Sequence, residues 1–375
     1  MNNTLLILCL PLLLAGCTPT RNGSQPRVDI DPGGSAISRG TGAEVLRAAN
    51  AFLATLSSTQ RSSVLLPYTQ ANAVTWSNLP VGVAPHNGVQ LGTLSSTQLA
   101  AALVVVRAAT GTAQAQGFDQ QMQIRAADDV LKVEGQGKTG PSSFSSGNYF
   151  LAFLGAPSAA GQWQLQFGGH HLALNVTYNK GSVTGATPMF EGVEPKCWSV
   201  SGTTTTADTC TAPGTSGSTT TYAPLYQEQQ AMAAMLAGLS PTQRSSARLS
   251  QTFTEVLLGP DQDSAFPLTK QGLAVSSLSS AQKTLVLAAI KPWVQDVDDL
   301  TAAALLEIYE GELDRTTLAY SGDPSLTSNA DYVRIDGPSV WIEFVCQRGR
   351  VYASQIHYHT VWRDHTRDYG ASFSF

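Results

Sequence analysis

The hydrophobic pattern of the chain changes between helix-like and strand-like spacing, in the order helices, strands, helices, strands. Helices are predicted over 43–56, directly after Ser57, and over 97–116, 119–133, 225–236, 241–249, 280–290 and 294–313. Strands are predicted over 149–154, 163–167, 170–178, 182–187, 317–320, 332–335, 340–346 and 351–360. This order predicts an α+β fold: a largely antiparallel sheet, built from two distant strand groups and flanked by helices. Residues 189–195 are expected to leave the sheet.

Four helix starts share one local pattern, a leucine followed by Ser-x-x-Gln. The leucines are Leu56, Leu94, Leu239 and Leu278. In each stretch the serine oxygen can accept from the amide three residues on, while the glutamine reaches back to the serine amide. Because the spacings between the four stretches are irregular and long, they predict helix caps rather than a solenoid of repeats.

The N-terminus predicts an exported protein. An apolar run over 5–15 is too short to span a bilayer, and it ends in Leu14-Ala15-Gly16-Cys17, which resembles a bacterial lipobox. The resemblance implies a signal peptide over 1–16, lipidation of Cys17 and a membrane anchor. A plain signal peptide has the same apolar core. Thr18, in place of aspartate, favours the outer over the inner membrane of the cell envelope.

Composition then divides the rest of the chain. Residues 17–40 are rich in Thr, Pro, Gly, Ser and Asn and predict a flexible tether, followed by a single α+β domain over 41–375. A Thr/Ser-rich insertion lies near 197–222, where Cys197 and Cys210 could close a disulfide in an oxidising compartment. Cys346 is interpreted as a buried strand residue, with a metal ligand near His357 as the rival reading. Since no basic stripe is present, nucleic acid is not an expected partner.

Two histidine pairs carry the candidate chemistry. His357 and His359 lie two residues apart in a predicted strand, so both imidazoles face the same side. The other pair is His170 and His171, and the predicted sheet would bring the two pairs into one layer. Adjacent strand residues face opposite ways, which favours His171 for a shared site; a distortion at Gly168-Gly169 would bring in His170 instead.

The C-terminal hairpin adds a carboxylate. A three-residue loop over 347–349 would bury the apolar sets of both strands on one side, by placing even residues opposite even ones. Glu343 then shares a face with His357 and His359. It becomes a candidate third ligand, or a carboxylate that orients an imidazole.

Several long motifs resemble a known family. They are Trp163…Phe167-Gly168-Gly169-His170-His171-Leu172…Asn175, Thr187-Pro188-Met189-Phe190-Glu191-Gly192-Val193-Glu194-Pro195, Arg334-Ile335-Asp336-Gly337-Pro338, Trp341-Ile342-Glu343, and His357-Tyr358-His359-Thr360-Val361-Trp362-Arg363-Asp364, ending in Asp368-Tyr369-Gly370. They resemble the bacterial domain of unknown function 3500 family, over most of the chain after the tether. The resemblance implies a fold and a site rather than a reaction. Arg363, Asp364 and Asp368 match the motif, and either a catalytic role or structural ion pairing fits them.

Three functions are consistent with these residues. His357, His359 and His170 or His171, with Glu343 or a water, suit zinc, copper or iron, as in a metal-dependent hydrolase or oxidoreductase. A metal-free hydrolase would use histidine as base with Glu343, Asp364 or Asp368, although no Gly-x-Ser-x-Gly elbow is present. The third is a non-catalytic envelope protein that binds a small molecule or a metal ion. The histidines could also simply hydrogen-bond within the sheet.

Overall fold

The computed structural model describes residues 42–134, 144–207 and 212–375. The predicted signal peptide over 1–16 and the tether over 17–40 lie outside these residues, as do Cys17 and Cys210. The predicted lipidation and disulfide therefore remain predictions. Within the described residues the helices are α1 Gly42–Ala54, α2 Ser58–Val64, α3 Gln70–Ala73, α4 Ser96–Ala109, α5 Phe118–Glu134, α6 Tyr226–Ala237, α7 Pro241–Ala247, α8 Ser280–Val294 and α9 Asp299–Glu312.

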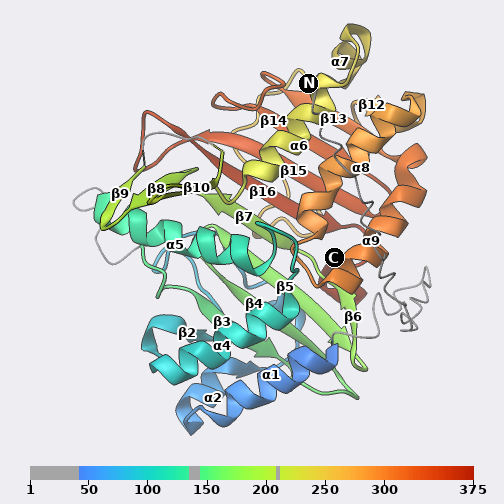
Figure 1. The fold of residues 1–375 in the computed structure, drawn as a ribbon. Coiled ribbons are helices and arrows are strands. Elements are labelled where there is room, and N and C mark those ends of the chain that lie inside the picture. The colour runs from blue at the N-terminus through green and yellow to red at the C-terminus, as the bar shows by residue number, and fades with distance from the viewer. Residues whose placement is uncertain (1–41, 135–143, 208–211) are drawn as a thin grey trace, which may run out of the picture.

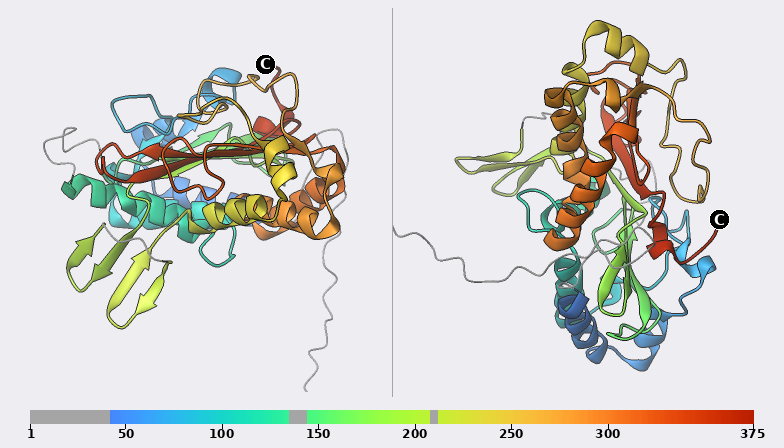
Figure 2. Two further views of the ribbon diagram at one scale, coloured as in Figure 1. Left: turned by 90° about the horizontal axis from the view of Figure 1, so that it is seen from above. Right: turned by 90° about the vertical axis from the view of Figure 1, so that its right-hand side faces the viewer.

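The strands of the described residues form two sheets (Figure 1). The large one contains β1 Leu65–Leu66, β2 Val89–Gln90, β3 Phe150–Leu154, β4 Gln162–Gly169, β5 Leu172–Asn179, β6 Ser182–Gly185, β7 Met189–Val193, β12 Leu273–Ala274, β13 Thr317–Ser321, β14 Tyr332–Asp336, β15 Val340–Arg348 and β16 Ile356–Asp364. The small one contains β8 Trp198–Ser201, β9 Thr204–Thr206, β10 Gly214–Ser216 and β11 Thr219–Tyr222. This small sheet, formed by the Thr/Ser-rich stretch, projects beyond the helices (Figure 2).

The large sheet confirms the predicted α+β class and its assembly from two distant strand groups. Its order is β1-β3-β4-β5-β7-β16-β15-β14-β13-β12, with β2 beside β3 and β6 beside β5. The groups meet where β7 pairs antiparallel with β16. All pairings are antiparallel except β1 with β3. A site at the β7–β16 contact therefore draws on both halves of the chain.

The two faces of the sheet are covered differently. Helices α1, α4, α5, α6, α8 and α9 lie against one face, and the segments before β2 and β12, which are largely irregular apart from the short helix α3, lie against the other (Figure 2). Alternation along the strands sorts the side chains: Ile342 and Phe344 belong to the core under the helices, while Val345 belongs to the core under the irregular segments. We call these the helix face and the loop face.

The two halves of the chain repeat one arrangement. Each begins with a helix pair (α1–α2, α6–α7). A short strand then leads into a longer helix (β2–α4, β12–α8), and one more helix (α5, α9) precedes the antiparallel strands. The first half also contains β1 and α3, which have no counterpart in the described part of the second half. All four predicted capping boxes are confirmed. The capping glutamines also pair within each half: Gln60 exchanges hydrogen bonds with Gln98, and Gln243 with Gln282. The recurring Ser-x-x-Gln pattern thus marks equivalent helix starts in the two halves.

One predicted element was wrong in kind. Residues 189–195 were expected to leave the sheet, yet β7 lies near its middle and joins β5 to β16. Every residue of β7 is buried, because Met189 and Val193 pack on the helix face and Phe190 on the loop face. Since both faces of β7 are covered, it lacks the alternating pattern that marks a half-exposed strand.

Other predicted boundaries moved for local reasons. The helix over 97–116 ends at Ala109, because Thr110 forms a β-bridge with Val297. The helix over 294–313 begins at Asp299, since the Asp298 side chain caps it by accepting from the Thr301 amide. The strand over 351–360 begins only at Ile356, so the loop of the last hairpin spans 349–355 rather than 347–349. Both loops have an odd length, and even residues still face even ones.

Candidate metal centre

His170 and His171 form the turn between β4 and β5. Gly169 pairs directly with Leu172, so the two histidines lie between the strands rather than in one. His171 has a left-handed backbone, with φ of 64°. A Cβ on Gly169 would lie 2.9 Å from the Asn148 carbonyl oxygen and from the Tyr149 ring, which leaves room only for glycine before the turn. The predicted strand over 170–178 therefore begins at Leu172. Since His170 and His171 lie in a turn, the expectation that adjacent strand residues face opposite sides of the sheet does not apply to them.

The sheet brings His171 next to His357 and His359. Gly192 of β7 lies opposite His359, and its amide donates to the carbonyl oxygen of His171. One nitrogen from each of the three imidazoles lies within 4.8 Å of the others, and the Nε2 atoms of His357 and His359 are 3.2 Å apart. We call these three residues the histidine cluster. It gathers side chains from both halves of the chain at the β7–β16 contact.

His170 lies beside the cluster and is bound to a helix. Its ring stacks on His171 with centroids 3.7 Å apart. Its Nδ1 lies 2.6 Å from Oδ1 of Asp128, a buried residue of α5. The Tyr149 hydroxyl donates to the His170 carbonyl oxygen at 2.6 Å. The Asp128 contact fixes the orientation of the His170 ring against the histidine cluster.

Glu255 orients His359 from the loop face. Nδ1 of His359 lies 2.9 and 3.0 Å from the two carboxylate oxygens of Glu255. A proton held on Nδ1 leaves the Nε2 lone pair of His359 free for a metal, as carboxylates do beside metal-bound histidines. Burial opposes the ionisation of Glu255, but attraction to His359 and hydrogen bonds from His359 and the Val256 amide lower its pKa. No sequence pattern singled out Glu255, because it lies in a segment without helix or strand periodicity.

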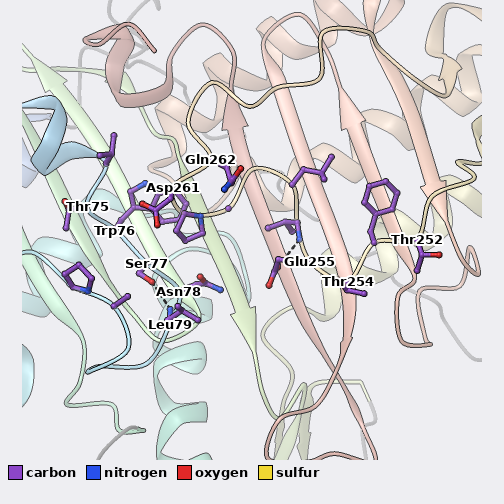
Figure 3. A pocket seen from close by; sticks show the side chains of 18 residues that line it. Thr75, Trp76, Ser77, Asn78, Leu79, Thr252, Thr254, Glu255, Asp261 and Gln262 are labelled. Atoms are coloured by element: carbon purple, nitrogen blue, oxygen red, sulfur yellow. Dashed lines mark hydrogen bonds between the residues drawn. The ribbon is translucent and has the colours of Figure 1, made fainter.

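A cavity of about 680 Å³ adjoins the histidine cluster. The segment that carries Trp76 and Asn78 lines one side, and the segment that carries Thr254 and Glu255 lines the other (Figure 3). Two of these residues also touch the cluster: Glu255 contacts His359, and the Asn78 carbonyl oxygen accepts from the His171 amide. Glu255 and Asn78 therefore lie between the cavity and the cluster.

Burial keeps His171 and His357 uncharged. His171, His357 and His359 are 5%, 1% and 6% exposed. Burial, followed by repulsion from the neighbouring imidazoles, lowers the pKa of His171 well below its usual range and that of His357 to about 2. Neutral imidazole is the form that binds a metal ion.

Glu343 shares the loop face but does not join the cluster. Its two oxygens accept from four donors: the Leu257 and Leu258 amides, the Trp341 indole and the Tyr332 hydroxyl. These bonds occupy the carboxylate and fasten the segment before β12 to β15. The candidate third ligand is therefore a structural anchor in this arrangement.

The other sequence candidates also have structural contacts. Arg363 pairs with Asp263 and Asp368 and donates to the carbonyl oxygens of Leu258 and Gly259. Asp364 accepts from the Tyr309 hydroxyl and pairs with Arg367. Cys346 is buried, and its thiol donates to the Leu326 carbonyl oxygen. None of these contacts brings a candidate into the histidine cluster.

Comparison with known proteins identifies the family. Residues 38–371 match the family described as protein of unknown function (DUF3500). The chain belongs to this family. The match confirms the resemblance seen in the motifs, and it includes both strand groups and the histidine cluster. No curated protein and no solved structure matches the chain.

Proposed function

We propose that this DUF3500 protein binds a divalent transition metal through His171, His357 and His359 and uses it to hydrolyse a small molecule held in the adjoining cavity. The observation that carries the proposal is the convergence of three buried imidazoles beside a cavity. Zinc, copper and iron all accept imidazole ligands, and zinc is the one that hydrolysis favours.

The spacing of the imidazoles suits one shared ion. Two nitrogens bound to a tetrahedral zinc at 2.0–2.1 Å lie about 3.3 Å apart. The observed 3.2 Å between the Nε2 atoms of His357 and His359 is close to this value. It also matches a direct hydrogen bond between the two rings, which is the structural alternative.

The number of ligands favours catalysis. Structural zinc sites generally have four protein ligands, whereas catalytic sites have three and keep a position for water or substrate. Among the described residues, the group around His171 has three members. Metal-bound water would supply the nucleophile, Glu255 would keep His359 in its binding tautomer, and polar groups such as Asn78 and Gln262 would face the substrate.

Burial of the cluster favours a second candidate. The three histidines are at most 6% exposed and do not line the cavity themselves. An ion bound at such a buried site could be stored by the protein as readily as it could take part in turnover of a substrate. The second candidate is therefore an envelope protein that binds a metal or a small ligand without catalysis.

The cellular setting is part of the proposal. We place the protein in the cell envelope, anchored through lipidated Cys17, on the strength of the lipobox-like sequence alone. In the described part of the chain, no helix has the length and apolarity needed to cross a bilayer.

Metal analysis of protein produced from the full chain, without a histidine tag, tests the site. We expect near-stoichiometric metal in the wild type and its loss in a folded His357→Ala/His359→Ala variant. His86→Ala is the matched control, because His86 lies outside the cluster and contacts Leu79 and Phe150. No metal after reconstitution with zinc, copper or iron would overturn the proposal. Metal without turnover of ester, amide or phosphoester substrates would leave the binding protein as the function.

A further inference from the structure

A second cluster of ionisable groups lies on the helix face of the sheet, away from the cavity. It consists of Glu191, Glu228 and Asp296, which we call the carboxylate cluster. One oxygen from each residue lies within 4.8 Å of the others, and the residues are 1%, 0% and 0% exposed. We propose that the carboxylate cluster is a binding site for a hard divalent cation such as Ca²⁺, Mg²⁺ or Mn²⁺, distinct from the site proposed at the histidine cluster.

The three carboxylates come from three separate elements. Glu191 is the central residue of β7, and Glu228 lies in the first turn of α6. Asp296 lies in the connection between α8 and α9. An ion bound between them would join the middle of the sheet to the helices that cover it.

The hydrogen bonds of the cluster are incomplete. Glu228 accepts from Gln120 at 2.6 Å, and Asp296 accepts from the Gly117 amide at 2.7 Å. Both oxygens of Glu191 and one oxygen each of Glu228 and Asp296 have no hydrogen-bond partner among the described residues. None of the three carboxylates forms a salt bridge with a described residue. Buried carboxylates are strongly unfavourable unless a cation or hydrogen-bond donors compensate them.

Neutral side chains next to the carboxylate cluster also lack hydrogen-bond partners. Gln120 is fully buried and donates to Glu228, but its own amide oxygen has no partner in the described chain. The side chain of Gln121, the next residue, is buried and has no hydrogen-bond partner among the described residues either. The Gln120 oxygen thus adds a neutral ligand atom close to Glu228. This second observation, independent of the acidic residues, also points to a ligand.

The donor atoms define the kind of ion. Carboxylate and amide oxygens suit Ca²⁺, Mg²⁺ and Mn²⁺, whereas imidazole nitrogens suit zinc, copper and iron. The carboxylate cluster contains no histidine or cysteine, and the histidine cluster contains no carboxylate. The two sites should therefore select different metals from one mixture.

Protons are the competing occupants. Burial raises the pKa of Glu228 to about 7, and burial with repulsion from Glu228 raises that of Glu191 to about 8. Burial, followed by repulsion from Glu191 and Glu228, raises the pKa of Asp296 well above its usual range. A divalent cation would displace these protons and complete the coordination.

The position of Glu191 connects the two faces of the sheet. Glu191 pairs with Leu172 and with Thr360, the residues that follow His171 and His359. Its neighbour Gly192 faces the rings of His171 and His359 on the loop face. A cation at the carboxylate cluster would therefore hold the strand against which the histidine cluster packs.

Thermal unfolding of chelator-treated protein produced from the full chain tests the site. Addition of Ca²⁺, Mg²⁺ or Mn²⁺ at about 100 times its dissociation constant should raise the Tm by roughly 3–6 °C. The Glu191→Gln/Asp296→Asn variant should lose this shift. The His357→Ala/His359→Ala variant should keep it, so failure of the proposed function would not be confused with failure of this site.

If the Glu191→Gln/Asp296→Asn variant does not fold, equilibrium dialysis of the wild type still tests whether the carboxylate cluster binds a cation. About one bound Ca²⁺, Mg²⁺ or Mn²⁺ per chain, retained in the His357→Ala/His359→Ala variant, would support the site. Absence of both binding and a Tm shift with all three cations would overturn the proposal and leave a proton-sharing carboxyl cluster.

Discussion

Gly192 sets the space in which the histidine cluster forms. A Cβ at this position would lie 3.0 Å from the rings of both His171 and His359 and 2.9 Å from the Tyr358 carbonyl oxygen. Only a residue without a side chain lets β7 run between β5 and β16 while the imidazoles approach across it. The glycine therefore belongs to the site although it offers no ligand atom.

The first prediction concerns Gly192→Ala. The added methyl group should displace the rings of His171 and His359 and weaken metal binding at the histidine cluster by tenfold or more, which is about 1.4 kcal/mol. Competition with a chromophoric chelator measures this affinity. Gly311→Ala is the control, because a Cβ on that α9 glycine meets nothing within 4 Å. Unchanged affinity in Gly192→Ala would show that the rings do not share an ion.

At the scale of elements, the loop face depends on segments without regular structure. The segment before β12 carries Glu255, lines the cavity, and is fastened to the sheet by Glu343 and Arg363. Glu343 is fully buried, and burial raises its pKa, but the four donors that it accepts from offset this cost. Anchors of this kind give an irregular segment the precision that a site requires.

The second prediction concerns Glu343→Gln. The glutamine amide would turn a donor toward groups that already donate, leaving buried donors unsatisfied. We expect the free energy of unfolding to fall by about 2–4 kcal/mol. Urea denaturation measures the loss, and Glu307→Gln, on the exposed surface of α9, is the control. If the two variants were equally stable, the anchoring role of Glu343 would be wrong.

Elements with a local signal were the predictable ones. The capping boxes hold their donors and acceptors within four residues, so the sequence alone predicted the four helix starts. The faces of β15 and β16 were predictable as well, because Ile342 and Phe344 on one strand and Tyr358 on the other occupy even positions, opposite in parity to Glu343, His357 and His359. The strand β7 was missed since it is covered on both sides and shows no alternation.

The site was predictable only in part, for a related reason. His171, His357 and His359 were candidates because they occur in pairs. Glu255 and Asp128 meet the histidines through contacts that join an irregular segment and a helix to the sheet. The carboxylate cluster likewise joins three elements far apart in the chain, and no spacing in the sequence relates Glu191 to Glu228 or Asp296.

At the scale of the whole molecule, the third prediction concerns attachment to the envelope. Cys17→Ser should remove lipidation and release the protein from the membrane fraction, because the tether would no longer carry acyl chains. Cell fractionation with an immunoblot measures this. Cys9→Ser is the control, since Cys9 lies within the predicted signal peptide. A Cys17→Ser protein that stayed with the membrane would contradict the lipoprotein assignment.

The two halves repeat the order of their main elements, as the subunits of a twofold dimer would if they shared one chain. Edge strands paired antiparallel, as β7 and β16 are, make the self-complementary contact of such a dimer. In a dimer of identical subunits, each turn would occur twice with the same sequence. Here the turn that holds His170 and His171 corresponds to Pro338 and Ser339 in the second half, where Gly337 pairs with Val340 as Gly169 does with Leu172. Because the two halves belong to one polypeptide, their sequences can differ where β7 meets β16, and a histidine pair can occupy the turn of one half alone.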